Sequence, residues 1–246
     1  MEEMTRSCID CASAGCDGNG KGRPSFCLTD SIGEGLLGES LEHYAEEEGD
    51  ILRAAATVEH DGYRRWCRVR ETMEFAKRMG YRRIGIATCV GLLSESRALA
   101  TILRANGFEV YGASCKAGMV NKVDVGIDPV CCEVGPNTCN PVLQAMVLNS
   151  VGTDLNIVVG LCVGHDSLFY RNSEAPVTTL VVKDRVMAHN PVGALYTSGS
   201  YYKDLKDGSA RSERPLDVAR YTASPGRNPS NDNASETRGT ATTASA

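Results

Sequence analysis

The sequence predicts an α/β protein. We expect a parallel sheet with crossover helices in a Rossmann-like three-layer arrangement, preceded by a four-cysteine metal knuckle and two helices. Two observations predict this fold. Between residues 82 and 184, short apolar segments alternate with segments of helical length, the order typical of strands joined by crossover helices. In addition, four cysteines fall within a stretch near the start of the chain that has few apolar side chains.

The cysteines of residues 7–27 have the spacing of a metal site. Ordering about twenty residues costs roughly 1–2 kcal/mol each in backbone entropy, whereas burying Ile9 and Phe26 returns only about 1.5–3 kcal/mol apiece. A structural zinc ion can supply about 10–16 kcal/mol. We therefore expect a knuckle that binds zinc or a [4Fe–4S] cluster through four thiolates, those of Cys8, Cys11, Cys16 and Cys27. The C-x2-C-x4-C run also resembles the cluster-holding segment of nickel carbon-monoxide dehydrogenases.

The elements of the α/β part follow from apolar periodicity and helix caps. The expected strands span residues 82–89, 108–115, 155–162 and 177–184, and the expected helices span 39–57, 64–79, 92–107 and 141–151. Gly80 ends the second of these helices. Asn140 is a preferred N-cap residue, Pro141 suits a first helical turn, and Gly152 favours a stop.

Composition divides the chain into three parts. From residue 205 onward the apolar periodicity is lost, and stretches such as NPSNDNASETRGTATTASA contain too few apolar side chains to offset the entropy of ordering. We expect a metal-binding knuckle at residues 1–37, an α/β domain at 38–204 and a disordered tail at 205–246.

Charge and cysteine usage exclude several classes of protein. The formal net charge of −5 argues against a nucleic-acid or anionic-membrane surface. No apolar run approaches the eighteen residues of a membrane span, and the first residues lack the apolar stretch of a secretory signal. Eleven cysteines, an odd count, favour reduced ligands or reactive thiols in the cytoplasm over a disulfide framework.

Cysteines also end the first three expected strands, at Cys89, Cys115 and Cys162. Ligands of an open parallel sheet bind at the carboxyl ends of its strands, and consecutive strands are usually neighbours. Further candidate ligands follow in the loop at 116–139 and after the third strand, namely Cys131, Cys132, Cys139 and His165. Because soft thiolates select zinc, copper(I) or iron–sulfur clusters, we expect a second metal or iron–sulfur site at this edge of the sheet.

The chain contains six distinctive segments: CIDCASAGC, YRRIGIATCVGLLSESR, EVYGASCK, IDPVCCEVGPNTCNPVLQA, LCVGHDSLFY and APVTTLVVKDRVMAHNPVGALY. In combination, they resemble the domain of unknown function 1847 family. The resemblance spans about residues 6–203. Members occur in anaerobic archaea and bacteria and are described only as candidate metal-binding proteins. The resemblance therefore implies the α/β fold and a bound metal, and it implies no particular reaction.

Three functions remain compatible with the sequence. The first is a metal-binding protein with a redox or metal-handling role, whose partners are a metal ion and a redox partner or small-molecule substrate. The second is an enzyme that uses Cys89 as a nucleophile at a helix N-terminus. A phosphatase-type loop is disfavoured, because Glu95 occupies the position of its arginine and Arg97 comes two residues late. The third is a non-catalytic module with structural zinc. Motifs for nucleotide binding are absent from the sequence.

Overall fold

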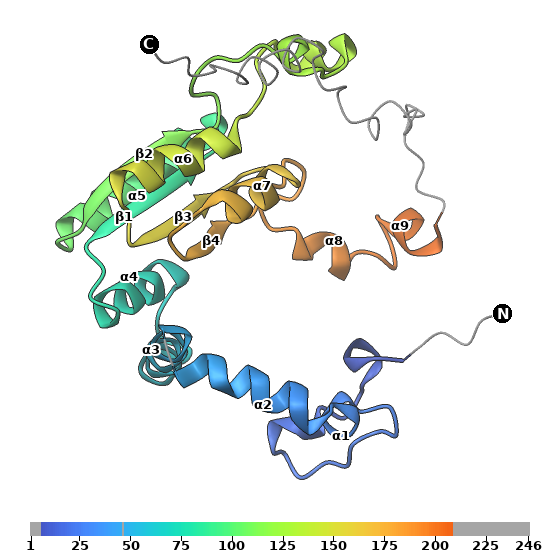
Figure 1. The fold of residues 1–246 in the computed structure, drawn as a ribbon. Helices are drawn as coiled ribbons and strands as arrows, with labels where there is room; N and C mark the ends of the chain where they lie inside the picture. The colour runs from blue at the N-terminus through green and yellow to red at the C-terminus, as the bar shows by residue number, and fades with distance from the viewer. Residues whose placement is uncertain (1–5, 46, 209–246) are drawn as a thin grey trace, which may run out of the picture. The chain divides into compact units, whose positions relative to one another are not determined.

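The structure, a computed structural model, describes residues 6–45 and 47–208. The helices of this part are α1 (Leu28–Ser31), α2 (Glu34–Glu42), α3 (Glu47–Gly62), α4 (Arg68–Arg78), α5 (Leu93–Ala105), α6 (Pro141–Val151), α7 (His165–Asn172), α8 (Val192–Tyr196) and α9 (Lys203–Asp207). The strands are β1 (Arg83–Thr88), β2 (Glu109–Ser114), β3 (Leu155–Val159) and β4 (Val177–Val181), as Figure 1 shows. The chain divides into two compact units. Among the described residues, the first contains 6–84 with 99–110, and the second contains 85–98 with 111–208.

The four strands form a parallel sheet in the order β2-β1-β3-β4, which confirms the predicted α/β class. β3 pairs with β4 from Asn156 opposite Val177, with an irregularity between Val158 and Val159. Every residue of β3 is buried, including the polar Asn156, so the strand lacks the apolar and polar alternation of a half-exposed strand. Gly160 directly follows the strand, and its φ of 70° lies in the left-handed region. A Cβ there would also lie 2.0 Å from Leu92 Cδ1, so the position has room only for glycine.

Alternate residues of the strands build the core of the second unit. Ala87 of β1 and Ala113 of β2 lie in one buried cluster with Leu148 of α6 and Phe169 of α7. Because side chains on a strand alternate between the two faces, α6 and α7 cover the same face of the sheet (Figure 1). The cluster also contains the cysteines that directly follow β1 and β2.

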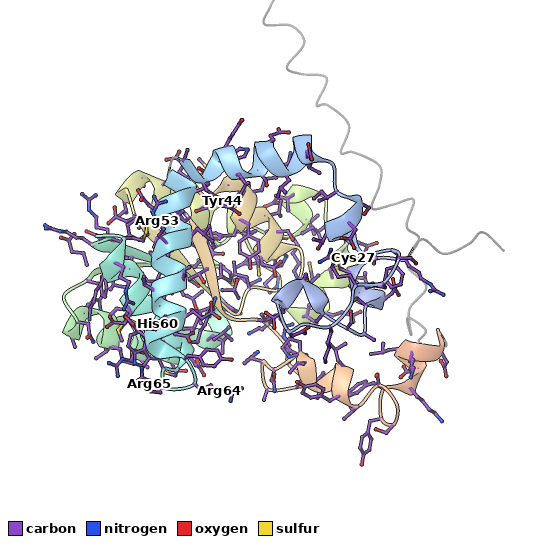
Figure 2. The ribbon with its side chains drawn as sticks, turned by 90° about the horizontal axis from the view of Figure 1, so that it is seen from below. Cys27, Tyr44, Arg53, His60, Arg64 and Arg65 are labelled. Carbon is purple, nitrogen blue, oxygen red and sulfur yellow. The ribbon has the colours of Figure 1, made fainter. Side chains whose placement is uncertain are left out.

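The helix expected at 39–57 is wrong as a single element. α2 ends at Glu42, a short 3-10 helix covers His43–Ala45, and α3 begins at Glu47. A Cβ on Gly49 would lie 2.0 Å from the carbonyl oxygen of Tyr44 and 2.9 Å from Nη1 of Arg53. Figure 2 labels both of these side chains. The missing side chain of Gly49 therefore lets the chain fold back on itself, a contact that helical periodicity does not reveal.

The helix expected at 64–79 begins four residues later, at Arg68, and ends before Gly80 as predicted. Arg64 has a φ of 55°, which is incompatible with a right-handed helix. Trp66 packs against Gly62, where a Cβ would lie 2.5 Å from its ring. Cys67, inside the expected helix, is instead the exposed N-cap residue of α4.

The described part of the chain ends just inside the predicted tail. The first residues of that tail, 205–207, belong to α9, and Gly208 follows with a φ of 72°. The rest of the predicted tail, 209–246, lies outside the described residues. Within the described ranges, no helix combines the length and the apolar character that crossing a membrane requires.

Candidate functional site

The four cysteines of the knuckle line one pocket of about 140 Å³. Cys8 begins a 3-10 helix at Cys8–Asp10, and Cys11 directly follows it. Cys16 lies in a second 3-10 helix at Gly15–Asp17, and Cys27 precedes α1. The structure thus brings together the thiols that the sequence spacing singles out.

Tight backbone turns shape this pocket. Ala14 has a φ of 47° and Gly18 a φ of 70°, both in the left-handed region. A Cβ on Gly15 would lie 2.5 Å from the carbonyl oxygen of Lys21, so two segments of the loop are in close contact at this glycine. The amide of Asn19 donates to the carbonyl of Ala14 at 3.1 Å. The loop is therefore held by backbone contacts rather than by apolar burial.

The polar surroundings of the knuckle favour thiolate at one position. Cys11 Sγ lies 3.6 Å from Ser13 Oγ. This side-chain hydrogen bond, followed by one from the Ala14 backbone, lowers the pKa of Cys11. A lowered pKa favours metal binding because only the thiolate coordinates.

The donor set of the knuckle fits zinc or a [4Fe–4S] cluster, since four thiols share one pocket. Among the described residues, no three Cys, His, Asp or Glu side chains are already set to coordinate an ion. Metal binding at the knuckle would therefore draw its sulfur atoms inward. The glycine-rich turns of this loop leave the backbone room for that movement.

The second group of thiols lies at the carboxyl ends of β1 and β2. Cys89 and Cys115 directly follow these strands and are 8% and 2% exposed. Cys89 comes two residues after Ala87, and Cys115 comes two residues after Ala113. All of these side chains belong to the buried cluster beneath α6. Both thiols therefore point to the same face of two adjacent strands.

Cys115 is the centre of a series of side-chain contacts that we call the strand-end cluster. Cys89 and Cys115 belong to one buried cluster, and Cys139 packs against it. The thiol of Cys115 interacts with those of Cys89 and Cys139, and Cys139 in turn interacts with His165, the first residue of α7. The strand-end cluster is therefore a continuous chain of four side chains: Cys89, Cys115, Cys139 and His165.

The loop at 116–139 is tied down, and this places Cys139. Lys116 Nζ donates to the carbonyl of Asn137, and Lys122, only 9% exposed, donates to the carbonyl of Cys131 at 2.5 Å. At the end of the loop, the backbone N–H of Asn140 donates to the carbonyl of Cys115 at 2.8 Å. Cys139 thus lies one residue from a direct backbone link to Cys115.

Hydrogen-bond donors surround the sulfur atoms of the strand-end cluster. The backbone N–H of Val90 donates to Cys115 Sγ at 3.3 Å, and that of Gly91 donates to Cys89 Sγ at 3.4 Å. The ammonium group of Lys183 also favours the thiolate of Cys89. Such donors stabilise negative charge on sulfur.

These contacts separate the protonation states of the thiols. The hydrogen bond with Cys115, with help from Gly91 and Lys183, lowers the pKa of Cys89 to about 5. Contacts with Cys115 and then His165 lower the pKa of Cys139 to about 4. The pKa of Cys115 is raised by both neighbouring thiols, and the pKa of His165 is raised by Cys139. Near neutral pH, two thiolates therefore flank one protonated thiol.

The remaining predicted ligands lie outside this chain of contacts. Cys162 is half-buried beyond β3, and its sulfur accepts a hydrogen bond from Nη2 of Arg185 at 3.3 Å. Cys131 and Cys132 are half-buried in a 3-10 helix at Pro129–Val134. In the part of the chain that the structure describes, neither of these two thiols hydrogen-bonds with the strand-end cluster.

Sequence reasoning missed Gln144, a fully buried residue of α6. Its Nε2 donates to the carbonyl of Thr88 at 3.1 Å and to that of Ala113 at 2.6 Å. It therefore connects the ends of β1 and β2 just before their cysteines. A polar residue between Leu143 and Ala145, on the apolar helix at 141–151, is the signal that could have identified it.

Searches against known proteins found one uncharacterised relative and distant structural likenesses. The chain is 45% identical over 169 residues to the uncharacterized protein MJ0455 of Methanocaldococcus jannaschii, covering 68% of this chain and 86% of that protein. Two crystal structures of Dph2 from Pyrococcus horikoshii, one with a 4Fe-4S cluster, match with a TM-score of 0.32. Their sequence identities to this chain are 22% and 19%. The match covers 57% of this chain, which spans about a third of the length of those structures.

A family model described as a protein of unknown function, DUF1847, matches residues 27–180. The matched segment begins at Cys27 and takes in the whole strand-end cluster, whereas the other three knuckle cysteines precede it. Since the match covers more than half of the sequence and a relative shares the identity given above, the chain belongs to the DUF1847 family.

Proposed function

We propose that the protein binds metal at two cysteine sites, the knuckle and the strand-end cluster. The observation that carries the proposal is the continuous contact chain from Cys89 through Cys115 and Cys139 to His165. Three thiols and an imidazole at one edge of the sheet form a soft donor set, which favours zinc, copper(I) or an iron–sulfur cluster over magnesium or calcium.

Charge provides a second argument for a cation at the strand-end cluster. Cys89 and Cys115 are buried, and Cys139 is half-buried. Ionising several such thiols together is costly unless a cation compensates them. Lys183 and Arg185 supply part of this compensation, and a metal centre would supply the rest. A bound iron–sulfur cluster would provide electron transfer, and bound zinc would provide a structural link or a Lewis acid.

The chain's own residues hold the donors in place. Gln144 ties the ends of the two strands, and the N–H of Asn140 links Cys139 to the carbonyl of Cys115. Arg185 hydrogen-bonds with Cys162, which remains an additional candidate ligand after β3. In the same proposal, residues 1–37 form the knuckle and 38–204 form the α/β domain.

Metal analysis of anaerobically purified protein tests this function. Elemental analysis and an absorption spectrum would be recorded for the native chain and for two double variants, Cys8→Ser/Cys11→Ser and Cys89→Ser/Cys139→Ser. We expect each double variant to lose one centre and keep the other. The control is Cys67→Ser, because Cys67 is exposed and belongs to neither site. Native metal content in both double variants would refute the proposal.

One observation favours a second candidate, an enzyme with Cys89 as its nucleophile. Cys89 is the N-cap residue of a 3-10 helix at Val90–Leu92, its sulfur accepts from Gly91 N–H, and its pKa is lowered to about 5. Alkylation of the native protein, followed by peptide mapping, separates the two candidates. A single fast-reacting thiol at Cys89 favours the nucleophile, whereas mutual protection of the cluster thiols, lost on chelation, favours the metal site.

A further inference from the structure

The thiols of Cys115 and Cys139 are placed for chemistry beyond metal binding. Cys139 packs against the buried cluster that contains Cys115, and the N–H of Asn140 donates to the carbonyl of Cys115 at 2.8 Å. A disulfide needs Cα atoms about 4.4–6.8 Å apart. Because Asn140 directly follows Cys139, its backbone hydrogen bond to Cys115 brings the main chain at Cys139 to a comparable separation from the main chain at Cys115.

Cys115 has two neighbouring thiols, and backbone freedom distinguishes them. Cys89 and Cys115 follow adjacent parallel strands directly, and Gln144 fixes both strand ends. Cys139 instead lies in irregular backbone between residue 137 and the start of α6. Disulfides require a specific torsion about the S–S bond, so the partner whose backbone can adjust is favoured. This argument selects Cys139.

Access to solvent gives the two thiols different roles. Cys139 is half-buried, whereas Cys115 is only 2% exposed. A small molecule arriving from solvent therefore reaches Cys139 first. Cys115 is more deeply buried than Cys139 and is therefore placed as the second, resolving thiol, which attacks the mixed disulfide formed at Cys139.

We propose that Cys139 and Cys115 form a dithiol–disulfide couple whose substrates are low-molecular-weight disulfides. The sulfur of Cys139 attacks one sulfur of the substrate RSSR, forming a mixed disulfide and releasing the first RS⁻. The sulfur of Cys115 then attacks Cys139 Sγ, forming the Cys115–Cys139 bond and releasing the second RS⁻. The proton of the Cys115 thiol and one proton from solvent end on the two RSH molecules. The protein is oxidised by two electrons and the substrate is reduced by two.

Formation of this disulfide would also remove two sulfur donors from the strand-end cluster. The inference rests on the proposed function, because it takes these same thiols as the functional site. It adds a substrate class and a form of regulation: oxidation by a small disulfide would release metal from the cluster, and reduction would restore binding.

Peptide mapping under non-reducing conditions tests the inference. The full chain, purified anaerobically and treated with a chelator, would be incubated with 2-hydroxyethyl disulfide, acid-quenched and digested. We expect a peptide that joins Cys115 to Cys139 in the native sequence and in the control Cys67→Ser. In Cys115→Ser, we expect loss of this peptide and persistence of a mercaptoethanol adduct on Cys139. In Cys139→Ser, both products should be lost.

If a variant fails to fold, the peptide map of the native sequence still decides the test by itself. A disulfide joining Cys115 to Cys89, or no linkage at Cys115, would overturn the inference. Metal content, measured beforehand in Cys8→Ser/Cys11→Ser, reports separately on the strand-end cluster. Metal without the linkage after chelation would refute the exchange and leave the proposed function standing. The linkage without metal would refute the metal site and leave the exchange standing.

Discussion

Gly85 of β1 occupies a position where any side chain would collide with a buried polar group. A Cβ there would lie 1.9 Å from Asn156 Oδ1 and 2.9 Å from Leu148 Cδ1. Asn156 is fully buried, and its side chain accepts a hydrogen bond from Thr153 and donates one to Ser173, both at 2.8 Å. The glycine therefore makes room for a satisfied polar network beneath the sheet.

We predict that Gly85→Ala lowers the free energy of unfolding by about 1–3 kcal/mol, because overpacking displaces the Asn156 side chain. Urea unfolding measures this change. Gly112→Ala in β2 is the matched control, since the nearest atom to its Cβ is 3.9 Å away. The control should be stabilised by about 0.4–1 kcal/mol through reduced entropy of the unfolded chain. Equal losses in both variants would show that the Asn156 contact is not the cause.

At the scale of elements, the start of α6 combines a helix cap with the placement of Cys139. The side chain of Asn140 accepts a hydrogen bond from the N–H of Leu143 at 3.0 Å. Pro141 occupies the first helical position, where a missing N–H costs nothing. The predicted boundaries of this helix, Pro141 and Val151, agree with the structure because both caps are local signals.

We predict that Asn140→Ala costs about 1 kcal/mol of stability, the usual value of an N-cap side chain. Chemical denaturation monitored by circular dichroism measures the difference. Asn140→Ser keeps a side-chain acceptor and should retain most of the stability. A Ser variant as unstable as the Ala variant would contradict the capping explanation.

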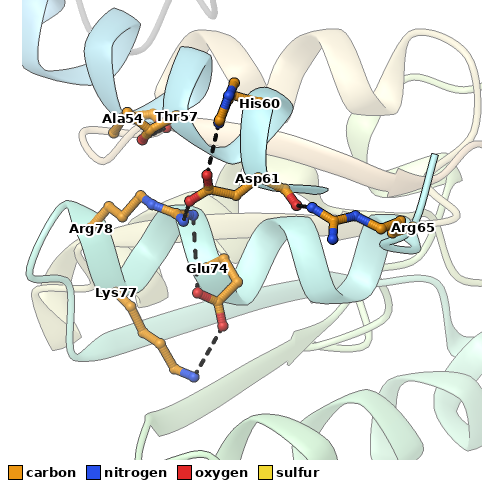
Figure 3. A network of polar contacts seen from close by, with 8 residues as sticks. All are labelled: Ala54, Thr57, His60, Asp61, Arg65, Glu74, Lys77 and Arg78. Atoms are coloured by element: carbon orange, nitrogen blue, oxygen red, sulfur yellow. Dashed lines mark hydrogen bonds and ion pairs between the residues drawn. The ribbon is translucent and has the colours of Figure 1, made fainter. Parts of the chain in front are cut away.

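The junction of α3 and α4 is held by charged groups around Asp61, as Figure 3 shows. The Asp61 carboxylate pairs with Nδ1 of His60 at 2.9 Å and accepts from Nη2 of Arg78 at 2.7 Å. Arg65 Nη2 donates to the Asp61 backbone carbonyl at 2.5 Å. The hydrogen bond from His60, and then Arg78, lowers the pKa of Asp61.

We predict an acid-dependent contribution from Asp61. Its folded pKa lies below the unfolded value of about 3.9, so its stabilisation is fully present above that value and is lost as pH falls through the lowered pKa. The unfolding free energies of the native chain and Asp61→Asn should therefore differ at pH 6 and converge in the acid range. A difference that stays constant down to the lowest pH would rule out this linkage.

At the scale of the whole molecule, the tail predicted from composition begins at residue 205, whereas the structure continues as α9 to Asp207. Composition predicts that this tail, residues 205–246, cannot bury enough apolar surface to offset ordering. Gly208, with a φ of 72°, is the C-cap residue of α9. We predict that a chain ending at Gly208 keeps its thermal midpoint and its metal content. A clear fall in either quantity, measured by calorimetry and elemental analysis, would show that the removed segment stabilises the fold.

Local chemistry explains which features were predictable from the sequence. The four strands, the helix at 141–151 and the glycine stops at 80 and 152 agree with expectation, because apolar period and caps act over a few residues. The single helix at 39–57 was wrong because its break depends on the contact between Gly49 and Tyr44. The helix expected from residue 64 begins later because of the backbone turn at Arg64.

The positions of the strands and of the candidate cysteines could thus be predicted from neighbouring residues. Which of these cysteines come together could not be predicted in this way. The order β2-β1-β3-β4 sets Cys89 beside Cys115, and the tied loop brings Cys139 to them rather than Cys131 or Cys132. Gln144 completes the arrangement from a helix more than fifty residues away from Thr88. These pairings arise from packing between distant segments, whose free energies depend on the whole fold, so only the tertiary structure decides which thiols meet.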